Sequence, residues 1–503
     1  MEIRKLRGEI TIFLSFIMLI LMSLIFTVIQ SAKTAAERAY IMSVADLGIH
    51  SVFSEYSKGL LEDFEIFGLH AGDQEGALYI DGLANKINEY MNYNLGTYDG
   101  GNAALQMDML NPIFVKGEVE EYMLLTDFGG EPFRKQAVEY ISGTLGIAGI
   151  ERLVGKAGEK DSMEAAKGTY ESEFKGNEEE ILNLQQGGGE VIESQIEEEE
   201  MEETAELKEA QGIWEALEAM KGMGSLSLVL QEPQNVSTKS IDTSAQLSKR
   251  TRNNGTITSM ESTREGLVEE LLFNEYILEH FSSHTENKSE SILDYQVEYI
   301  IEGKSSDVAN LRGVVDKILL IRAGSNFLYL MQDTAKVAEA QLLATLLVGI
   351  FLMPPLIEAT KIAILLGWAY IESILDMRAL LSGKNVPLFK NAGNWQSSLM
   401  NIPSLLSNFE EVKEEENGMS YRDYMRILLL ATKRETTTYR AMDIVEGAIR
   451  RKGDTKIRLD NCVVQIVFVS NWQLNLNMLM VLGQGKGSSN QGIQVRNRQT
   501  YSY

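Results

Sequence analysis

The stretch that decides the fold is ITIFLSFIMLILMSLIFTVI, residues 10–29. Its polar members, Thr11, Ser15, Ser23 and Thr27, carry hydroxyls that can bond to carbonyls of their own helix. About 20 apolar residues in a helix cross the ~30 Å hydrocarbon core of a bilayer. Residues 10–30 are therefore predicted to form a single membrane anchor. The predicted lipid-facing residues are Ile10, Phe13, Leu14, Phe16, Ile17, Leu19, Ile20, Leu21, Leu24, Ile25, Phe26 and Ile29.

A cleaved secretory signal peptide is the alternative interpretation of this stretch. Signal peptides usually have an apolar region of only ~7–15 residues. A small-residue cleavage pattern occurs here only loosely, around Ser31 and Ala32. A retained anchor is the better prediction.

Flanking charges predict the orientation of the anchor. Arg4, Lys5 and Arg7 precede it, whereas Lys33 and Arg38 follow it. Since basic residues favour the cytoplasmic side, residues 1–9 are expected to be a cytoplasmic tail. The expected location is the cell membrane, with the bulk of the chain extracytoplasmic.

The anchor helix is expected to continue beyond the membrane. No proline occurs between Ile10 and Tyr56, and the only glycine there is Gly48. At 1.5 Å per residue such a helix reaches roughly 70 Å, the length of a stalk or a pilin-like shaft. Small side chains would let another helix approach closely, although helix propensity alone also explains an alanine-rich segment. The candidate helix-packing face is Ala32, Ala35, Ala36 and Ala39.

Charge and cysteine content exclude some functions. The 503-residue chain has a formal net charge of -26, which argues against nucleic acid as a partner because phosphate recognition needs clustered basic residues. The single cysteine, Cys462, allows no intrachain disulfide. An extracytoplasmic protein without disulfides fits many Gram-positive bacteria.

An acidic segment divides the rest of the chain. Residues 159–209 hold eighteen acidic and four basic residues, a net charge of -14. Residues 159–225 are therefore predicted to be a disordered or loosely helical linker. Residues 31–158 would then form a helical stalk and the first part of a helical domain, with helices over 81–93 and 132–145.

The segment after the linker predicts an α+β domain over residues 226–480, followed by a flexible tail over 481–503. Strands are expected at 293–301, where apolar residues alternate, and at 462–469. Helices are expected over 265–280, 307–330, 335–352, 356–381 and 420–452. The predicted fold class is mainly α (α+β), with a small sheet packed by many helices. The apolar stretches 342–357 and 362–371 are interpreted as a buried helical hairpin, with a second membrane contact as the alternative.

No motif indicates catalysis, a cofactor or a metal site. His280 and His284 would share a helix face, but the Glu of a zinc-protease motif and a third ligand are missing. The glycines around Lys486 do not form a phosphate loop, and no nucleophile elbow is present. The chain is therefore predicted not to be an enzyme, and an anchored hydrolase is the least favoured alternative.

Aromatic and charged residues gather in one predicted helix, at Trp368, Tyr370, Glu372, Asp376 and Arg378. Such residues usually belong to a core, but they could instead line a ligand pocket. A surface sensor or ligand-binding receptor is accordingly the alternative function.

Several short segments resemble an uncharacterised family of Gram-positive membrane proteins related to the TadE/TadG-like minor pilins. They include Arg7-Gly8-Glu9-Ile10-Thr11-Ile12-Phe13-Leu14, Ser51-Val52-Phe53-Ser54-Glu55-Tyr56, Lys239-Ser240-Ile241-Asp242, Leu272-Phe273-Asn274-Glu275-Tyr276, Val297-Glu298-Tyr299-Ile300, Gly367-Trp368-Ala369-Tyr370-Ile371-Glu372-Ser373 and Leu375-Asp376-Met377-Arg378-Ala379-Leu380.

This resemblance implies a structural or assembly component of a tight-adherence (Tad) pilus or a type IV-like secretion system. The implied partners are the lipid bilayer and other pilin-like or secretion-platform proteins, and no active residues carry over. One departure is that Gly8 is followed directly by Glu9, and Phe13 stands where prepilins have glutamate. Prepilin-peptidase cleavage is therefore not expected.

Overall fold

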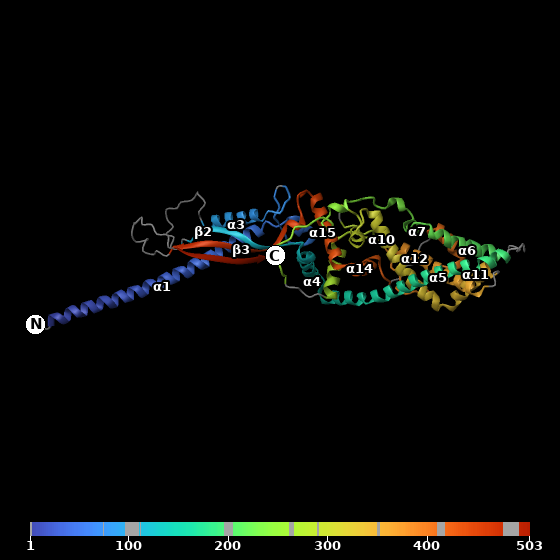
Figure 1. Cartoon of the computed structure of the whole chain (residues 1–503), viewed down its shortest axis with the longest axis horizontal. Helices are drawn as coiled ribbons and strands as arrows, with labels where there is room; N and C mark the ends of the chain where they lie inside the picture. Colours follow the sequence, from blue (N-terminus) through green and yellow to red (C-terminus); the bar gives the residue numbers. More distant parts are fainter. Residues whose placement is uncertain are drawn as a thin grey trace. The chain divides into compact units, whose positions relative to one another are not determined.

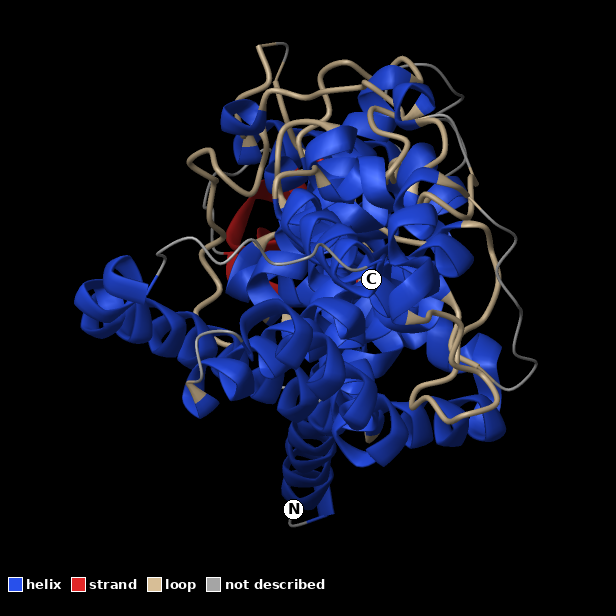
Figure 2. Ribbon diagram, turned by 90° about the vertical axis from the view of Figure 1, so that its right-hand side faces the viewer, coloured by secondary structure: helices blue, strands red, loops and turns tan. Residues whose placement is uncertain are grey.

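The computed structural model describes residues 3–73, 75–95, 110, 112–195, 205–260, 266–288, 291–349, 353–409, 418–475 and 492–503. Helices dominate it and the strands form one small sheet (Figure 2), so the predicted mainly α (α+β) class is confirmed. The chain divides into two compact units. Unit 1 contains residues 1–133, 251–261 and 452–503, and unit 2 contains residues 134–250 and 262–451.

Unit 1 is built on an antiparallel sheet of four strands. Its long central strand β3 pairs with β2 along one edge and with β4 and the short β1 along the other. The bounds are β1 Leu69–His70, β2 Ile113–Leu124, β3 Cys462–Asn475 and β4 Gly492–Ser502. The predicted strand at 462–469 is thus confirmed, and it continues for six further residues.

Helix α1, Ile3–Phe53, is continuous as predicted, and its second half packs with α3 and β3 in unit 1 (Figure 1). The buried face of α1 includes Ile41, Val44 and Val52, in one core with Trp472 of β3. The prediction of a helix over 81–93 is confirmed by α3. The remaining unit 1 helices are α2 Lys58–Phe64, α3 Ile80–Asn94 and the 3-10 turn η5 Leu459–Asn461.

Unit 2 is helical in the residues that the structure describes. Its longest helices are α4 Asp127–Ala157, which begins within unit 1, α5 Glu159–Gln195, α10 Asp307–Gln332 and α12 Pro354–Leu381. The others are α6 Ala205–Lys221, α7 Ser225–Val229, α8 Leu267–His280, α9 Gln296–Glu302, α11 Thr334–Val348, α13 Ile402–Ser407, α14 Tyr421–Ala431 and α15 Arg434–Arg451, with 3-10 turns η1 Pro233–Asn235, η2 Thr243–Ala245 and η4 Leu399–Asn401.

The apolar stretches of α11 and α12 form a packed pair of helices, in line with the predicted hairpin. Ile364, Leu365 and Trp368 of α12 are fully buried, whereas Leu342 of α11 is exposed. Only α1 is long and apolar enough to cross a membrane among the described residues.

The acidic segment, predicted to be a disordered or loosely helical linker, is helical in its described residues, where it forms α5 and α6. Helix α5 packs against α10 and α12, and Met163, Ala166 and Tyr170 are its buried contacts. The Tyr170 hydroxyl donates to the carbonyl of Leu366, 3.2 Å away. Acidic residues occupy the solvent side, so high charge is compatible with a docked helix here.

Three further expectations are corrected. Residues 293–301 contain the helix α9 rather than a strand. Six consecutive residues of α9 are buried, so the alternation of apolar side chains does not distinguish the period of a helix from that of a strand. The tail predicted over 481–503 contains strand β4. The domain boundaries also differ, since β3 and β4 complete a sheet with β2, which lies before the acidic segment.

Candidate functional site: helix α1 and its groove

The predicted anchor residues are all exposed on α1. Their exposed fractions range from 37% at Ile17 and Ile29 to 67% at Phe13 and Leu19. The mean hydropathy of the most apolar 18-residue window is 2.9, and none of that window is buried in the fold. An exposed apolar surface of this extent marks a site of contact with a membrane or with another protein. The helix has the length and composition of a membrane anchor, properties that a signal sequence shares.

Hydroxyl groups in the apolar stretch bond to the helix backbone, as predicted. Ser15 Oγ donates to the carbonyl of Thr11 and Thr27 Oγ1 donates to that of Ser23, each at 2.8 Å. Since these hydrogens are paired within the helix, the hydroxyls cost little to place in hydrocarbon.

The candidate packing face of α1 is open in this structure. Ala32, Ala35, Ala36 and Ala39 are all exposed. The opposite side of the helix carries the buried core residues, and a Cβ at Gly48 would lie 2.6 Å from Met91 Cγ of α3. Helix α1 therefore uses one side to hold unit 1 together and presents small side chains on the other. Binding of a second helix at this face stays a prediction.

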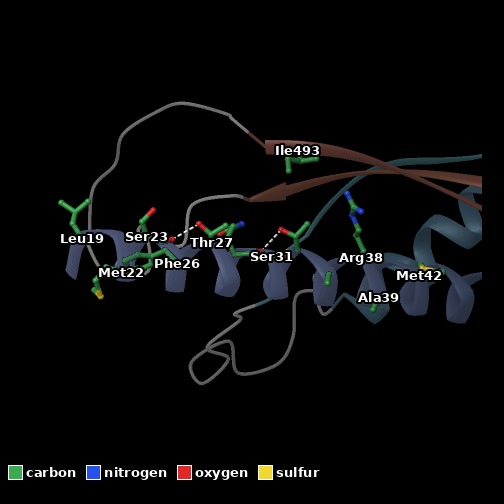
Figure 3. Close-up of a pocket in the computed structure, with 13 residues that line it drawn as sticks. Leu19, Met22, Ser23, Phe26, Thr27, Ser31, Arg38, Ala39, Met42 and Ile493 are labelled. Carbon is green, nitrogen blue, oxygen red and sulfur yellow. Dashed lines mark hydrogen bonds between the residues drawn. The ribbon is translucent and has the colours of Figure 1, made fainter. Parts of the chain in front are cut away.

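A groove of about 1260 Å³ runs along α1 beside the start of β4 (Figure 3). Leu19, Met22 and Phe26 line its amino-terminal part. Gln30, Ser31, Thr34 and Arg38 give the next part a polar character, with Ala35, Ala39, Met42 and Ile493 also in the wall. Arg38 points from α1 toward the strands in the close-up.

The seam between α1 and β4 contains buried polar atoms that make no hydrogen bond within the described residues. Glu37 is fully buried, both carboxylate oxygens lack a hydrogen-bond partner, and its nearest cation is Lys33 Nζ at 3.6 Å. Three other buried atoms also lack a hydrogen-bond partner: Gln30 Nε2, Asn497 Nδ2 and Gln499 Oε1. A direct side-chain bond joins β4 to α1 here, from Gln499 Nε2 to the carbonyl of Met42, at 3.1 Å. Buried groups without partners weaken an interface, so this seam is less tightly held than the apolar core.

The residues considered for a ligand pocket form a buried charge network in unit 2. Asp376 Oδ2 accepts from Arg322 Nη2 at 2.8 Å, and Lys390 Nζ lies 2.8 Å from Asp376 Oδ1 and 2.7 Å from Glu372 Oε1. Trp368 Nε1 donates to Ser397 Oγ at 2.9 Å. Carbonyls of Leu228, Leu405 and Asn408 accept from Arg378. These polar groups bind the loop after α12 to the helices. Tyr370, the fifth of the residues considered, takes part in none of these contacts, and burial raises its pKa.

Buried acids outside this network have raised pKa values. Glu298 is completely buried, which raises its pKa to about 7, although Tyr421 and the His284 amide both donate to it. Asp443 has a pKa of about 6 for the same reason, with Ser248 and Tyr299 as donors. Both acids are fully buried, so these shifts bear on the stability of the fold.

The two histidines on one predicted helix face are separated by the helix end. Helix α8 stops at His280, whose ring stacks on Tyr276, while His284 follows in a loop against Tyr295. No group of three or more metal-ligating side chains occurs in the described part of the chain. Cys462 is a buried free thiol. The glycines around Lys486 lie outside the described residues.

Sequence reasoning missed the groove and the polar seam, because both depend on β4. The alternation from Ile493 to Tyr501 is a strand pattern, with Val495 turned inward and Arg496 and Arg498 turned outward. It was hidden within a polar segment after a glycine-rich stretch. The unusual density of Gln30, Glu37 and Arg38 on an otherwise apolar and alanine-rich helix was the other available signal.

Comparisons with known proteins give one match. The model of a family described as "Family of unknown function (DUF5702)" matches residues 203–474, slightly more than half of the chain. No curated protein and no solved structure matches.

Proposed function

We propose that this chain, which belongs to the family of unknown function DUF5702, is a membrane-anchored structural or assembly component of a Tad-like pilus or secretion system. It would act through protein contacts, with no catalytic role and no cofactor. Its anchor would be residues 10–29, with the amino terminus in the cytoplasm and both units outside. Its partners would be the bilayer and other pilin-like or secretion-platform proteins.

The observation that carries the proposal is the difference between the two halves of α1. Its first half is apolar and unpacked, while its second half lies on an antiparallel sheet and leaves its alanine face open. Small residues on an exposed helix next to a membrane span allow close helix packing. The resemblance to TadE/TadG-like proteins supports the same interpretation and supplies the class of partner.

Crosslinking of a tagged full-length chain in native membranes, with mass spectrometry of the products, tests this proposal. Recovery of pilin-like or secretion-platform proteins is the expected result. The variant Ala32→Leu/Ala36→Leu should lose these crosslinks, because both side chains lie on the open face away from the groove. Ala219→Leu, at an exposed position of α6, is the matched control and should retain them. An anchored chain that crosslinks to no other protein would refute the assembly role.

A further inference from the structure

The groove beside α1 changes in polarity along its length. Its amino-terminal wall is Leu19, Met22 and Phe26, which belong to the apolar stretch. Ser31 and Thr34 lie roughly one and two helical turns after Phe26, and Arg38 lies about one turn after Thr34. A single continuous surface therefore runs from hydrocarbon-like side chains through hydroxyls to a guanidinium.

The heights of these residues match the layers of a bilayer. If the hydrocarbon core ends near Ile29, a rise of 1.5 Å per residue puts the Cα of Ser31 ~3 Å and that of Thr34 ~7 Å beyond it. The headgroup layer is about 5–8 Å thick on each side. The Cα of Arg38 is ~13 Å beyond the core, and a long Arg side chain extends toward the headgroups from such a position.

Arg38 has no carboxylate partner among the described residues. It is exposed, and its guanidinium takes part in no ion pair or hydrogen bond in that part of the chain. A free cation is notable in a chain with a net charge of -26, where nearby acids are plentiful. An anion bound at this point of the groove would neutralise the Arg38 guanidinium.

We propose that the groove binds an anionic phospholipid, with its acyl chains along Leu19, Met22 and Phe26 and its phosphate at Arg38. This inference rests on the proposed function, because it requires residues 10–29 to lie in a bilayer. The Ser31 hydroxyl lies beside the headgroup as a further polar group, whereas the Thr34 hydroxyl donates to the carbonyl of Gln30, 2.9 Å away.

A second copy of α1 fits the groove less well. Two anchors inserted in the same direction lie at the same height, so Arg38 of one copy would face Arg38 of the other. Like charges at close range are unfavourable in a partly desolvated site. The lipid leaves Ala32 and Ala36 open, because these two residues do not line the groove, whereas Ala35 and Ala39 lie in its wall.

Native mass spectrometry of the full chain tests the charge contact. The chain is placed in nanodiscs of phosphatidylcholine with a minor share of phosphatidylglycerol, released, and the retained lipid is identified. The wild type should retain phosphatidylglycerol preferentially. Arg38→Gln should lower that preference about fivefold, which corresponds to the ~1 kcal/mol of one basic residue at an anionic surface. Lys58→Gln removes the same charge at an exposed site outside the groove and should leave the preference unchanged.

A photo-crosslinking residue at position 31 identifies the occupant directly. Lipid adducts from Ser31 in the groove, exceeding those from Ala32 on the open face, are expected. Equal effects of Arg38→Gln and Lys58→Gln, or protein adducts from position 31, would overturn the lipid site while leaving the anchor intact. A chain that fails to enter the nanodiscs would instead refute the proposed function and the lipid site with it.

Discussion

Replacing Arg322 by Met should severely destabilise unit 2. The guanidinium is fully buried, donates to Asp376 at 2.8 and 3.0 Å, and holds the carbonyls of Pro387 and Leu388 at 2.8 Å. Met fills a similar space but leaves the Asp376 carboxylate with Lys390 as its only remaining cation. Breaking a buried ion pair on one side typically costs ~3–5 kcal/mol. Because whole domains are stable by only ~5–15 kcal/mol, this is a large share of the total.

Urea unfolding followed by tryptophan fluorescence measures this loss. Trp368 and Trp395 lie next to the network and report on it directly. The midpoint should fall with little change in the slope. Lys116→Met, which breaks an exposed pair with Glu118, is the control and should leave the midpoint close to that of the wild type. An Arg322→Met protein within 1 kcal/mol of the wild type would refute the reasoning.

Three further changes test other parts of the fold. A Cβ at Gly324 would lie 2.5 Å from the backbone of Ala166. The variant Gly324→Val should therefore displace α5 and raise hydrogen exchange over residues 159–184. The control Gly168→Ala has open space around the new Cβ and should leave this exchange unchanged. Gly48→Val should loosen α3 from α1 by ~1–3 kcal/mol, measured as faster exchange of α3 amides. Burial raises the pKa of Glu298 from 4.5 to about 7. The free energy of unfolding should therefore fall by up to about 3 kcal/mol as pH rises from 4.5 to 7. This pH dependence should be smaller in Glu298→Gln, and an unchanged profile would contradict the assignment.

The elements predicted correctly are those with strong local signals. Short stretches of sequence were enough to predict the apolar run of α1, the long helices α10 and α12, and the β-branched strand β3. Local periodicity also predicted that the hydroxyls of α1 would bond within their own helix.

The elements predicted wrongly depend on contacts distant in the sequence. The sequence of α5 resembles a solvated segment because its buried apolar residues are few in the described part of the helix. They are Met163, Ala166 and Tyr170, spaced by three and four residues. That spacing is a helical signal, but the surrounding acidic residues outweigh it in composition. Helix α9 is buried on every side, so its sequence lacks the polar face that would separate a helix from a strand.

Unit 1 also explains why the candidate site escaped prediction. Its sheet joins residues separated by more than 300 positions, and β4 reaches α1 only after unit 2 has been completed in the sequence. The ring centroids of Tyr501 and Tyr503 lie 4.5 and 5.0 Å from that of Phe53, so the last strand is fixed to the end of α1. A load on α1 therefore passes into β3 and β4 through side chains. The polar seam is a weakly held part of that path, because buried atoms of Gln30, Glu37, Asn497 and Gln499 make no hydrogen bond within the described residues.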